Sequence, residues 1–176
     1  MPVQRARSHE GSAEDLSLEV LGGSHLEFVS EPRLLFPNSS FSQVTRVSVD
    51  SSSRVVLVDA VVRHPDPGPV SYLSETRLEF DGEVVAVERM GFENIAEHHF
   101  GATVLILAVG EYVTGIDWKP WLKRHGAPTS YGAVSPIRQC PGISVRVVAD
   151  DGRYLREAID DALSILLCAS AGDITP

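Results

Sequence analysis

Cysteine is scarce in this chain of 176 residues, which contains only Cys140 and Cys168. The two lie in different contexts and form no Cys-x-x-Cys pair or Cys/His ligand spacing, so neither a zinc finger nor a thiol redox motif is predicted. Cys168 stands beside Leu166 and Leu167 in an expected helix. We therefore expect it to be buried as a small apolar residue.

Long apolar runs are also missing. The longest, residues 104–109, has the length of a strand, whereas roughly 20 apolar residues are needed to cross a bilayer. Residues 1–15 are polar and lack the apolar core of a signal peptide. These two absences predict a cytoplasmic protein without a membrane partner.

Basic residues are in the minority, because 15 Lys and Arg stand against 24 Asp and Glu, for a formal net charge of −9. Nucleic acid would be repelled on average by that charge, so we expect no nucleic-acid partner. The acidic balance fits a protein that meets other proteins or cations, but it selects no particular one.

The common catalytic signatures are absent as well. The chain has no Gly-rich phosphate loop, no Gly-x-Gly-x-x-Gly after a strand, no Gly-x-Ser-x-Gly elbow and no His-Glu-x-x-His zinc helix. The adjacent pair His98-His99 is interpreted as part of a polar loop, and His64 and His125 as surface positions. The absence of these motifs, and the scattered positions of the histidines, give no indication of a common enzymatic site or of a metal centre.

What the chain does contain is enough apolar material for one domain. Hydrophobic residues make up 43% of the sequence, which at this length supports a buried core. Residues 1–15 are interpreted as a flexible leader and residues 16–176 as a single domain.

The first half of that domain has the pattern of β-strands. Apolar and polar residues alternate in residues 16–20 and 25–29, which predicts a hairpin. Two prolines limit residues 33–36 to an edge strand or an ordered loop. Residues 43–50 and 54–63 are expected to form a long strand pair, and the second is so rich in β-branched residues that it should be buried on both faces or between layers.

Further strands and two helices are expected after a proline-rich loop at residues 64–69. Asp81-Gly82 between two strand-like runs predicts a hairpin, because type I′ turns require positive φ. Residues 102–109 and 143–148 are expected strands. Helices are expected at residues 117–125 and 153–169, and the apolar stripe of the second should pack on a sheet. The predicted fold is mainly β, layered or β-helix-like, with about two helices near the C-terminus.

Three carboxylates stand in unusual surroundings. Asp59 lies inside the apolar run of residues 55–62, where a charge is costly unless it is paired or used. Glu88 precedes Arg89 at the end of a strand, where the two could form an internal ion pair, and Glu31 precedes Pro32 at the entrance to an apolar segment. A salt bridge or an exposed strand end is the alternative explanation for each.

One segment resembles a known family. Residues 30–43 read Ser-Glu-Pro-Arg-Leu-Leu-Phe-Pro-Asn-Ser-Ser-Phe-Ser-Gln. This segment resembles a part of the urease accessory protein UreD (UreH) family that has Pro-Glu/Gln-Pro, an apolar stretch with Phe, a small residue and then Gln. In that family a buried strand with an acidic end follows, and residues 54–59 are similar to it.

Further pieces match the family in the same order. The turn Asp81-Gly82 with Val87-Glu88-Arg89 is similar to a family hairpin that ends in Asp/Glu-Arg, and residues 101–105 are similar to an Ala-Thr-Val-Leu strand. Residues 131–147 are similar to Gly-Ala-Ser, Pro-Gly and Val-Val-Arg segments before the last helix. The resemblance covers residues 16–167. It rests on the fact that the similar pieces occur in the same order in this chain and in the family.

Two departures accompany this resemblance. Family members usually begin with a longer N-terminal portion, so the chain is expected to be an N-terminally shortened or divergent member, or only part of a functional unit. The family also usually has a Gly-Arg and Gly-Glu loop where residues 64–69 read His-Pro-Asp-Pro-Gly-Pro.

The resemblance implies a non-enzymatic scaffold or chaperone in urease maturation, with a layered β fold and a helical pair. Such proteins bind the urease apoprotein and UreF, which recruits the GTPase UreG, and the assembly delivers nickel to the urease active site. No resident cofactor is implied, because nickel passes in transit through an internal channel lined partly by acidic and polar side chains. Glu31, Asp59 and Glu88 are our candidates for that path or for the partner surface, since oxygen ligands exchange more readily than thiolates.

Two other functional classes remain open from the residues alone. A stand-alone β-sandwich module that binds a small ligand would use exposed aromatic residues, but these make up only 7% of the chain. An enzyme with a pair of carboxylates would need them to converge in a cleft.

Overall fold

Two β-sheets and a layer of helices stack against one another in the computed structural model, which describes residues 11–66, 68–95, 101–126 and 128–172. The four-stranded sheet has the order β1-β4-β6-β7, with strands β1 (Ser12–Val20), β4 (Ser40–Val49), β6 (Val70–Phe80) and β7 (Glu83–Ile95). The six-stranded sheet has the order β2-β5-β8-β10-β9, with β3 beside β5, and contains β2 (His25–Val29), β3 (Arg33–Leu35), β5 (Arg54–Arg63), β8 (Ala102–Val109), β9 (Ser130–Pro136) and β10 (Gly142–Ala149).

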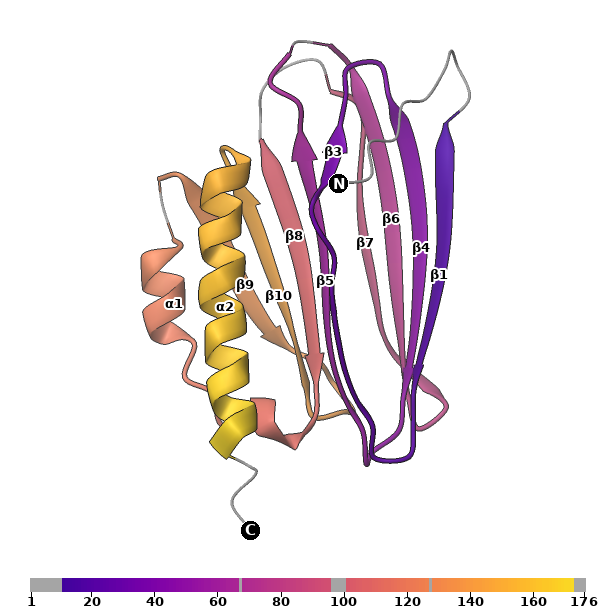
Figure 1. Cartoon of the computed structure of the whole chain (residues 1–176), viewed down its shortest axis with the longest axis vertical. Helices are drawn as coiled ribbons and strands as arrows, with labels where there is room; N and C mark the ends of the chain where they lie inside the picture. The colour runs from indigo at the N-terminus through magenta and orange to yellow at the C-terminus, as the bar shows by residue number, and fades with distance from the viewer. Residues whose placement is uncertain (1–10, 67, 96–100, 127, 173–176) are drawn as a thin grey trace.

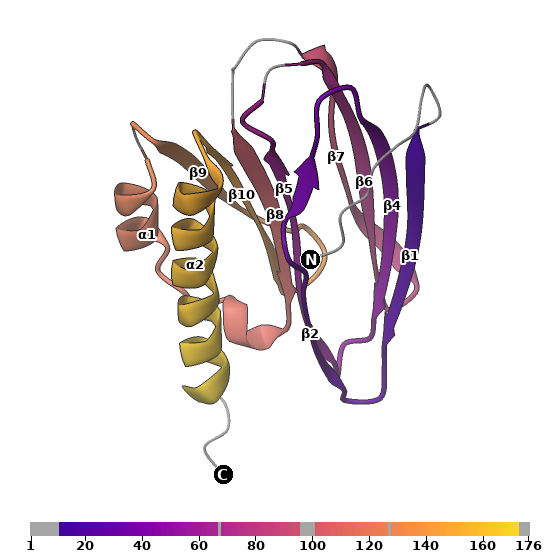
Figure 2. The same ribbon diagram turned by 45° about the horizontal axis from the view of Figure 1, so that its top comes forward.

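The helices cover the face of the six-stranded sheet that points away from the four-stranded sheet (Figures 1 and 2). They are η1 (Glu111–Val113), α1 (Lys119–Arg124) and α2 (Gly152–Gly172). Asp151 caps the start of α2, because its Oδ1 accepts hydrogen bonds from the backbone N–H groups of Arg153 and Tyr154 at 2.8 and 3.1 Å. Both predicted helices are confirmed, and the apolar stripe of α2 packs on the sheet.

The first strands wind like a β-helix. The chain passes from the four-stranded sheet (β1) to the six-stranded sheet (β2, β3), back to β4, across to β5 and back again to β6. Successive passes pair in parallel, so Ser12 lies beside Phe41 and His25 beside Arg54, each 29 residues further along. The prediction of a mainly β, layered and β-helix-like fold is confirmed.

Hydrogen bonds also join the turns at one end of this winding. The backbone N–H of Gly22 donates to Asp50 Oδ2 at 2.6 Å, and the N–H of Ser51 donates to Asp81 Oδ1 at 2.8 Å. The hydrogen bond from Gly22, followed by those from Ser52 and Ser53, lowers the pKa of Asp50 to about 2. These hydrogen bonds between successive turns therefore help to hold the neighbouring parallel strands in register.

Two predicted strand pairings are wrong. Residues 16–20 and 25–29 were expected to form a hairpin, but β1 and β2 belong to different sheets. The expected pair 43–50 with 54–63 is likewise divided between β4 and β5. A period of two predicts that a strand has an inside face, but not whether the next strand lies beside it or across the core. The Asp81-Gly82 hairpin is confirmed, with φ of 50° and 83° and antiparallel pairing of β6 with β7.

Some local predictions also need correction. Strand β1 begins at Ser12, so residues 12–15 belong to the sheet and not to the predicted leader 1–15. Cys168 is exposed, because it lies off the buried stripe of α2. His125 is buried, because its ring packs on Trp121 and its Nε2 lies 2.9 Å from Asp161 Oδ2 on α2. The predicted loop at His98-His99 lies outside the described residues.

Strand β5 lies between two hydrophobic layers. Val55, Leu57 and Val61 face the four-stranded sheet, and Val56 and Val58 pack toward α2. Strand β8 is buried at every position beside it. This confirms the prediction that the β-branched run would be buried on both faces.

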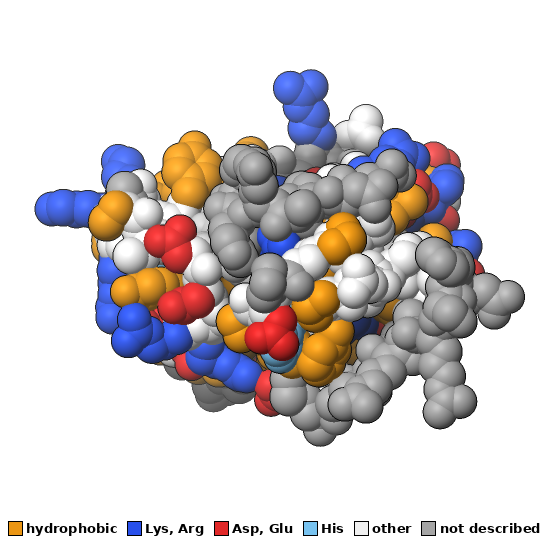
Figure 3. All heavy atoms as spheres, turned by 90° about the horizontal axis from the view of Figure 1, so that it is seen from above, with side chains coloured by type: hydrophobic (Ala, Val, Ile, Leu, Met, Phe, Trp, Pro, Cys, Tyr) orange, Lys and Arg blue, Asp and Glu red, His pale blue; other side chains and the backbone are white. Residues whose placement is uncertain are grey.

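The end of the sandwich where β4 and β6 begin is built from the loops after β3 and β5. The Phe36 and His64 rings stack with centroids 4.7 Å apart, and the backbone N–H of Asn38 donates to the Pro69 carbonyl at 2.7 Å. Figure 3 looks onto this end and shows hydrophobic side chains reaching the surface beside a histidine and scattered charges. The described part of the chain has no helix that is both long and apolar enough to cross a membrane.

Substitution of Leu57 tests whether the layer between the two sheets is a packed core. Its side chain is 2% exposed in the layer between the sheets, so Leu57→Ala should lower the free energy of unfolding by about 2–5 kcal/mol, measured by urea denaturation. Leu73 on the outer face of the four-stranded sheet is 60% exposed, and Leu73→Ala should change stability by less than about 0.5 kcal/mol. Equal effects of the two substitutions would contradict the layering.

Candidate functional site

A band of polar side chains crosses the layer between the two sheets. It separates two apolar clusters, one containing Leu57 and Leu78 and the other containing Val61 and Tyr72. We call it the inter-sheet polar band. Its members are Glu14, Gln43, Thr45, Ser74, Thr76 and Glu88 from the four-stranded sheet, and Arg33, Asp59, Thr103, Ser144 and Arg146 from the six-stranded sheet.

The strand register places these residues in rows. On the four-stranded sheet Glu14, Gln43 and Ser74 are lateral neighbours, and in the next inward row Thr45, Thr76 and Glu88 are neighbours. On the six-stranded sheet Asp59 and Arg146 flank Leu105 in a single row. The band is therefore a consequence of strand pairing, because several paired strands carry polar residues at the same height.

Asp59 lies near the middle of the band and is 3% exposed. Its Oδ1 accepts a hydrogen bond from Arg33 Nη1 at 2.9 Å, and its Oδ2 lies 3.4 Å from Ser74 Oγ and 3.5 Å from the Tyr72 hydroxyl. The other Arg33 nitrogen donates to Glu14. Burial raises the pKa of Asp59 above its usual 3.8, and the Arg33 charge opposes that shift.

Glu88 joins the two sheets at the opposite side of the band. Its Oε1 accepts from Ser144 Oγ at 3.0 Å, and its Oε2 accepts from Arg146 Nε at 3.2 Å. Both donors belong to β10, whereas Glu88 belongs to β7. Thr103 Oγ1 makes a second link between the sheets, 3.4 Å from Met90 Sδ.

The two partly exposed arginine–carboxylate pairs lie at the edges of the band, and Asp59 and the neutral members lie inside. Glu14 and Arg33 on β1 and β3 are partly exposed, as are Glu88 and Arg146 on β7 and β10. Buried amide and hydroxyl groups lie between these pairs: Gln43, Thr45, Ser74, Thr76 and Thr103. An arginine–carboxylate pair therefore closes each edge of a continuous polar layer.

Two buried oxygen atoms in this layer have no hydrogen-bond partner, Gln43 Oε1 and Thr76 Oγ1. Buried polar atoms are normally satisfied by protein, water or an ion. The band offers carboxylate, amide and hydroxyl oxygens, which are ligands that exchange readily. Within the ranges that the structure describes, no group of three or more His, Cys, Asp or Glu side chains could hold a metal ion, so a closed metal cage is not formed there.

The structure brings two of the three predicted residues into the band, Asp59 and Glu88. The expected Glu88–Arg89 ion pair is wrong, because Arg89 Nε pairs with Glu75 Oε2 at 2.8 Å while Glu88 pairs with Arg146. Adjacent strand residues point to opposite faces, which separates Glu88 from Arg89.

Glu31 lies outside the band. Its side chain is 62% exposed and pairs with Arg156 Nη2 of α2 at 2.7 Å. It therefore belongs to the helix side of the six-stranded sheet, and the structure does not place it beside Asp59 or Glu88.

Most of the band was missed from the sequence, including Glu14, Arg33, Gln43, Ser74 and Arg146. A usable signal was present, because Gln43 and Ser74 occupy inward positions of strands whose other inward residues are mostly apolar. Glu14 was assigned to the leader and so was not considered as a strand residue.

The fold and the band together define a class of protein, a layered β structure with a β-helix-like winding, a helical cover and an internal polar layer. Comparison with known sequences identifies the family within this class. The model of the UreD urease accessory protein family matches residues 3–173. The chain belongs to this family.

The relatives agree with that assignment. "Urease accessory protein UreD 2" of Bradyrhizobium sp. (strain ORS 278) is 25% identical over 93% of this chain and 61% of its own length. "Urease accessory protein UreD" of Mycolicibacterium smegmatis is 31% identical over 84% of this chain and 55% of its own length. "Urease accessory protein UreD 1" of Pseudomonas syringae pv. tomato is 26% identical over 89% of this chain and 60% of its own length. The chain thus spans somewhat more than half the length of these relatives.

The buried carboxylate gives a prediction about pH. The pKa of Asp59 is raised in the folded state, so the folded chain is favoured while Asp59 is protonated. This contribution to the free energy of unfolding is fully present below pH 3.8 and is lost as pH rises through the folded pKa. Asp59→Asn removes that contribution. The stability of the wild type relative to this variant should therefore fall as pH rises from about 3.8 toward the folded pKa, measured by urea unfolding from pH 3.8 upward and including the interval from about pH 4.5 to 7.

Asp50→Asn is the matched control. With its pKa lowered to about 2, Asp50 is ionised in both states across this interval, so its contribution is lost only at lower pH. The difference between wild type and Asp50→Asn should stay constant from about pH 4.5 to 7. A difference for Asp59→Asn that does not fall anywhere above about pH 3.8 would show that burial does not raise the pKa of Asp59.

Proposed function

We propose that this chain acts as a non-enzymatic scaffold in urease maturation. In this role it binds the urease apoprotein and UreF, and through UreF it meets the GTPase UreG in the cytoplasm. The proposal is supported by membership of the UreD urease accessory protein family over residues 3–173. It concerns the chain as it stands, which corresponds to about 60% of a relative such as the Bradyrhizobium protein.

We further propose that the inter-sheet polar band handles nickel in transit. Three carboxylates, Glu14, Asp59 and Glu88, face two guanidinium groups, those of Arg33 and Arg146. With all three carboxylates ionised the formal charge of the band is negative, which favours a cation over an anion inside the sandwich. Because burial raises the pKa of Asp59, this negative charge is present only when Asp59 is ionised. A cation entering at an edge would compete with arginine for the same carboxylate oxygens.

The observation that carries this proposal is the buried polar layer itself. A sandwich core normally excludes ionisable groups because desolvation is costly. Here the band interrupts an otherwise apolar core at one height in neighbouring strands and leaves Gln43 Oε1 and Thr76 Oγ1 without partners.

Partner binding is the first test. The purified chain should retain UreF or the urease apoprotein from a lysate that contains both, detected by affinity capture and immunoblotting. Leu57→Ala serves as a folding control, because loss of the core should reduce capture together with stability. Failure of the correctly folded wild type with both partners would contradict the scaffold role.

Nickel loading tests the band separately. Asp59→Asn and Glu88→Gln should each lower the nickel content and activity of urease matured with the variant, while capture of the partners remains. Glu31→Gln is the matched control, since Glu31 is a carboxylate outside the band that pairs with Arg156. Equal loading by all three variants would remove the band from the nickel path and leave the scaffold role intact.

A further inference from the structure

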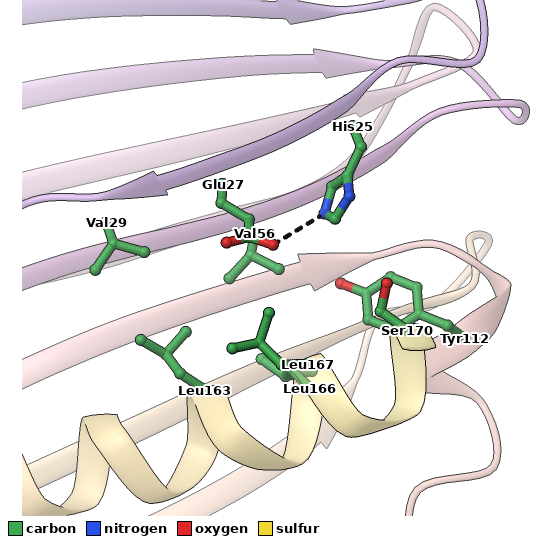
Figure 4. A pocket seen from close by; sticks show the side chains of 9 residues that line it. All are labelled: His25, Glu27, Val29, Val56, Tyr112, Leu163, Leu166, Leu167 and Ser170. Carbon is green, nitrogen blue, oxygen red and sulfur yellow. Dashed lines mark ion pairs between the residues drawn. The ribbon is translucent and has the colours of Figure 1, made fainter. Parts of the chain in front are cut away.

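A groove lies between strand β2 and the second half of helix α2, on the opposite face of the six-stranded sheet from the polar band. It is lined by His25, Glu27, Val29, Val56, Tyr112, Leu163, Leu166, Leu167 and Ser170 (Figure 4). Val29 and Leu167 on its two walls are 47% and 51% exposed. Large apolar side chains thus meet solvent on both sides of one depression.

The strand wall of this groove is the edge of a sheet. In the described part of the chain, β2 pairs with β5 on one side only and stands at the end of the sheet order. An edge strand offers unpaired backbone N–H and C=O groups to another extended chain. A segment adding to β2 would extend the sheet over α2 and direct alternate side chains into the groove.

Packing at one end of the groove is incomplete. The Tyr112 hydroxyl is buried without a hydrogen-bond partner, and Ser170 lines the same end of the groove (Figure 4). An unpaired buried hydroxyl is unfavourable, and rearrangement around an incoming backbone carbonyl would relieve it.

The charges around the groove indicate what kind of segment could bind there. Helix α2 ends at Gly172 with no basic residue in its last turn, so its final carbonyl groups present partial negative charge near Ser170. Glu27 adds a carboxylate, paired only with His25 at 3.5 Å among the ion pairs of the described residues, and Arg54 lies over the Tyr112 ring. The chain as a whole carries −9. Arg54 adds a positive charge at the Tyr112 end of the groove, whereas Glu27 and the C-terminal end of the α2 dipole are negative. A basic group is therefore favoured beside Glu27 and the end of α2.

The same charges disfavour a second copy of this chain. A symmetric antiparallel pairing centred on β2 would set Glu27 opposite Glu27, and like charges directly opposite in a sheet are destabilising. Both copies would also carry the same net negative charge.

We propose that the groove between β2 and α2 docks an extended segment of a partner protein. The segment adds as a strand to β2, inserts an apolar side chain between Val29 and Leu167, and places a lysine or arginine near Glu27 and the end of α2. This proposal does not depend on nickel passing through the polar band, because it concerns the other face of the sheet.

The test uses a synthetic peptide of four alternating Lys-Leu units, with the matching Glu-Leu peptide as the charge control. Binding to the whole chain is followed by fluorescence anisotropy at physiological salt, and the site by hydrogen exchange. The Lys-Leu peptide should bind, slow exchange in residues 25–29 and the second half of α2, and exceed the Glu-Leu peptide by about tenfold in affinity.

Single substitutions test whether the Lys-Leu peptide binds in the groove between β2 and α2. Leu167→Asp and Glu27→Lys should each weaken binding of the Lys-Leu peptide by about tenfold. Leu73→Asp and Glu19→Lys make the same chemical changes at exposed positions of the four-stranded sheet, and should leave affinity within about twofold. Circular dichroism checks that each variant is folded.

Several outcomes would overturn the proposal. They are no binding of the Lys-Leu peptide, equal binding of both peptides, equal loss in the control variants, or slowed exchange confined to other elements. A wild-type dimer in sedimentation with β2 already protected would assign the groove to a second copy. Binding that appears only after removal of residues 173–176 would assign it to this chain's own end.

Discussion

Strand β5 has to satisfy two hydrophobic layers at once, and the arrangement of the other elements depends on this constraint. Its side chains alternate between the inter-sheet layer and the layer beneath α2. The four-stranded sheet can therefore pack on one face and the helix on the other. Strand β8 beside it is likewise buried on both faces. The six-stranded sheet is therefore the central layer of the molecule.

The position of Asp59 on this strand explains the polar band. A carboxylate among apolar neighbours has a high free energy unless hydrogen bonds and an opposite charge compensate for desolvation. Arg33 on β3 and Ser74 and Tyr72 on β6 supply these, so two other strands contribute. Because β6 is paired in register with β4 and β7, and β4 with β1, polar side chains at the same height extend this compensation sideways into a polar layer.

The two faces of the six-stranded sheet thus have different chemistry. Asp59 contributes to an internal layer of charged and hydroxyl-bearing groups, while Val56, three residues earlier on β5, forms part of the apolar groove beside α2. Glu31 connects to the groove side through Arg156 and not to the band. For a UreD family protein, cation handling and partner docking would then be carried by opposite faces of one sheet.

The amino-acid sequence by itself determined most of the element types, the Asp81-Gly82 hairpin, the amphipathic helix α2 and the double burial of β5, because these follow from local periodicity and turn chemistry. It also singled out Asp59 and Glu88 as carboxylates in unusual places. It did not indicate strand β9 (Ser130–Pro136) or the strand character of residues 12–15. Only the tertiary structure decided that β1 and β2, and likewise β4 and β5, lie in different sheets, and that Glu88 meets Arg146 while Glu31 lies outside the band. Those choices depend on contacts between residues far apart in the chain, and a period of two is the same whether a strand turns back beside its neighbour or crosses the core.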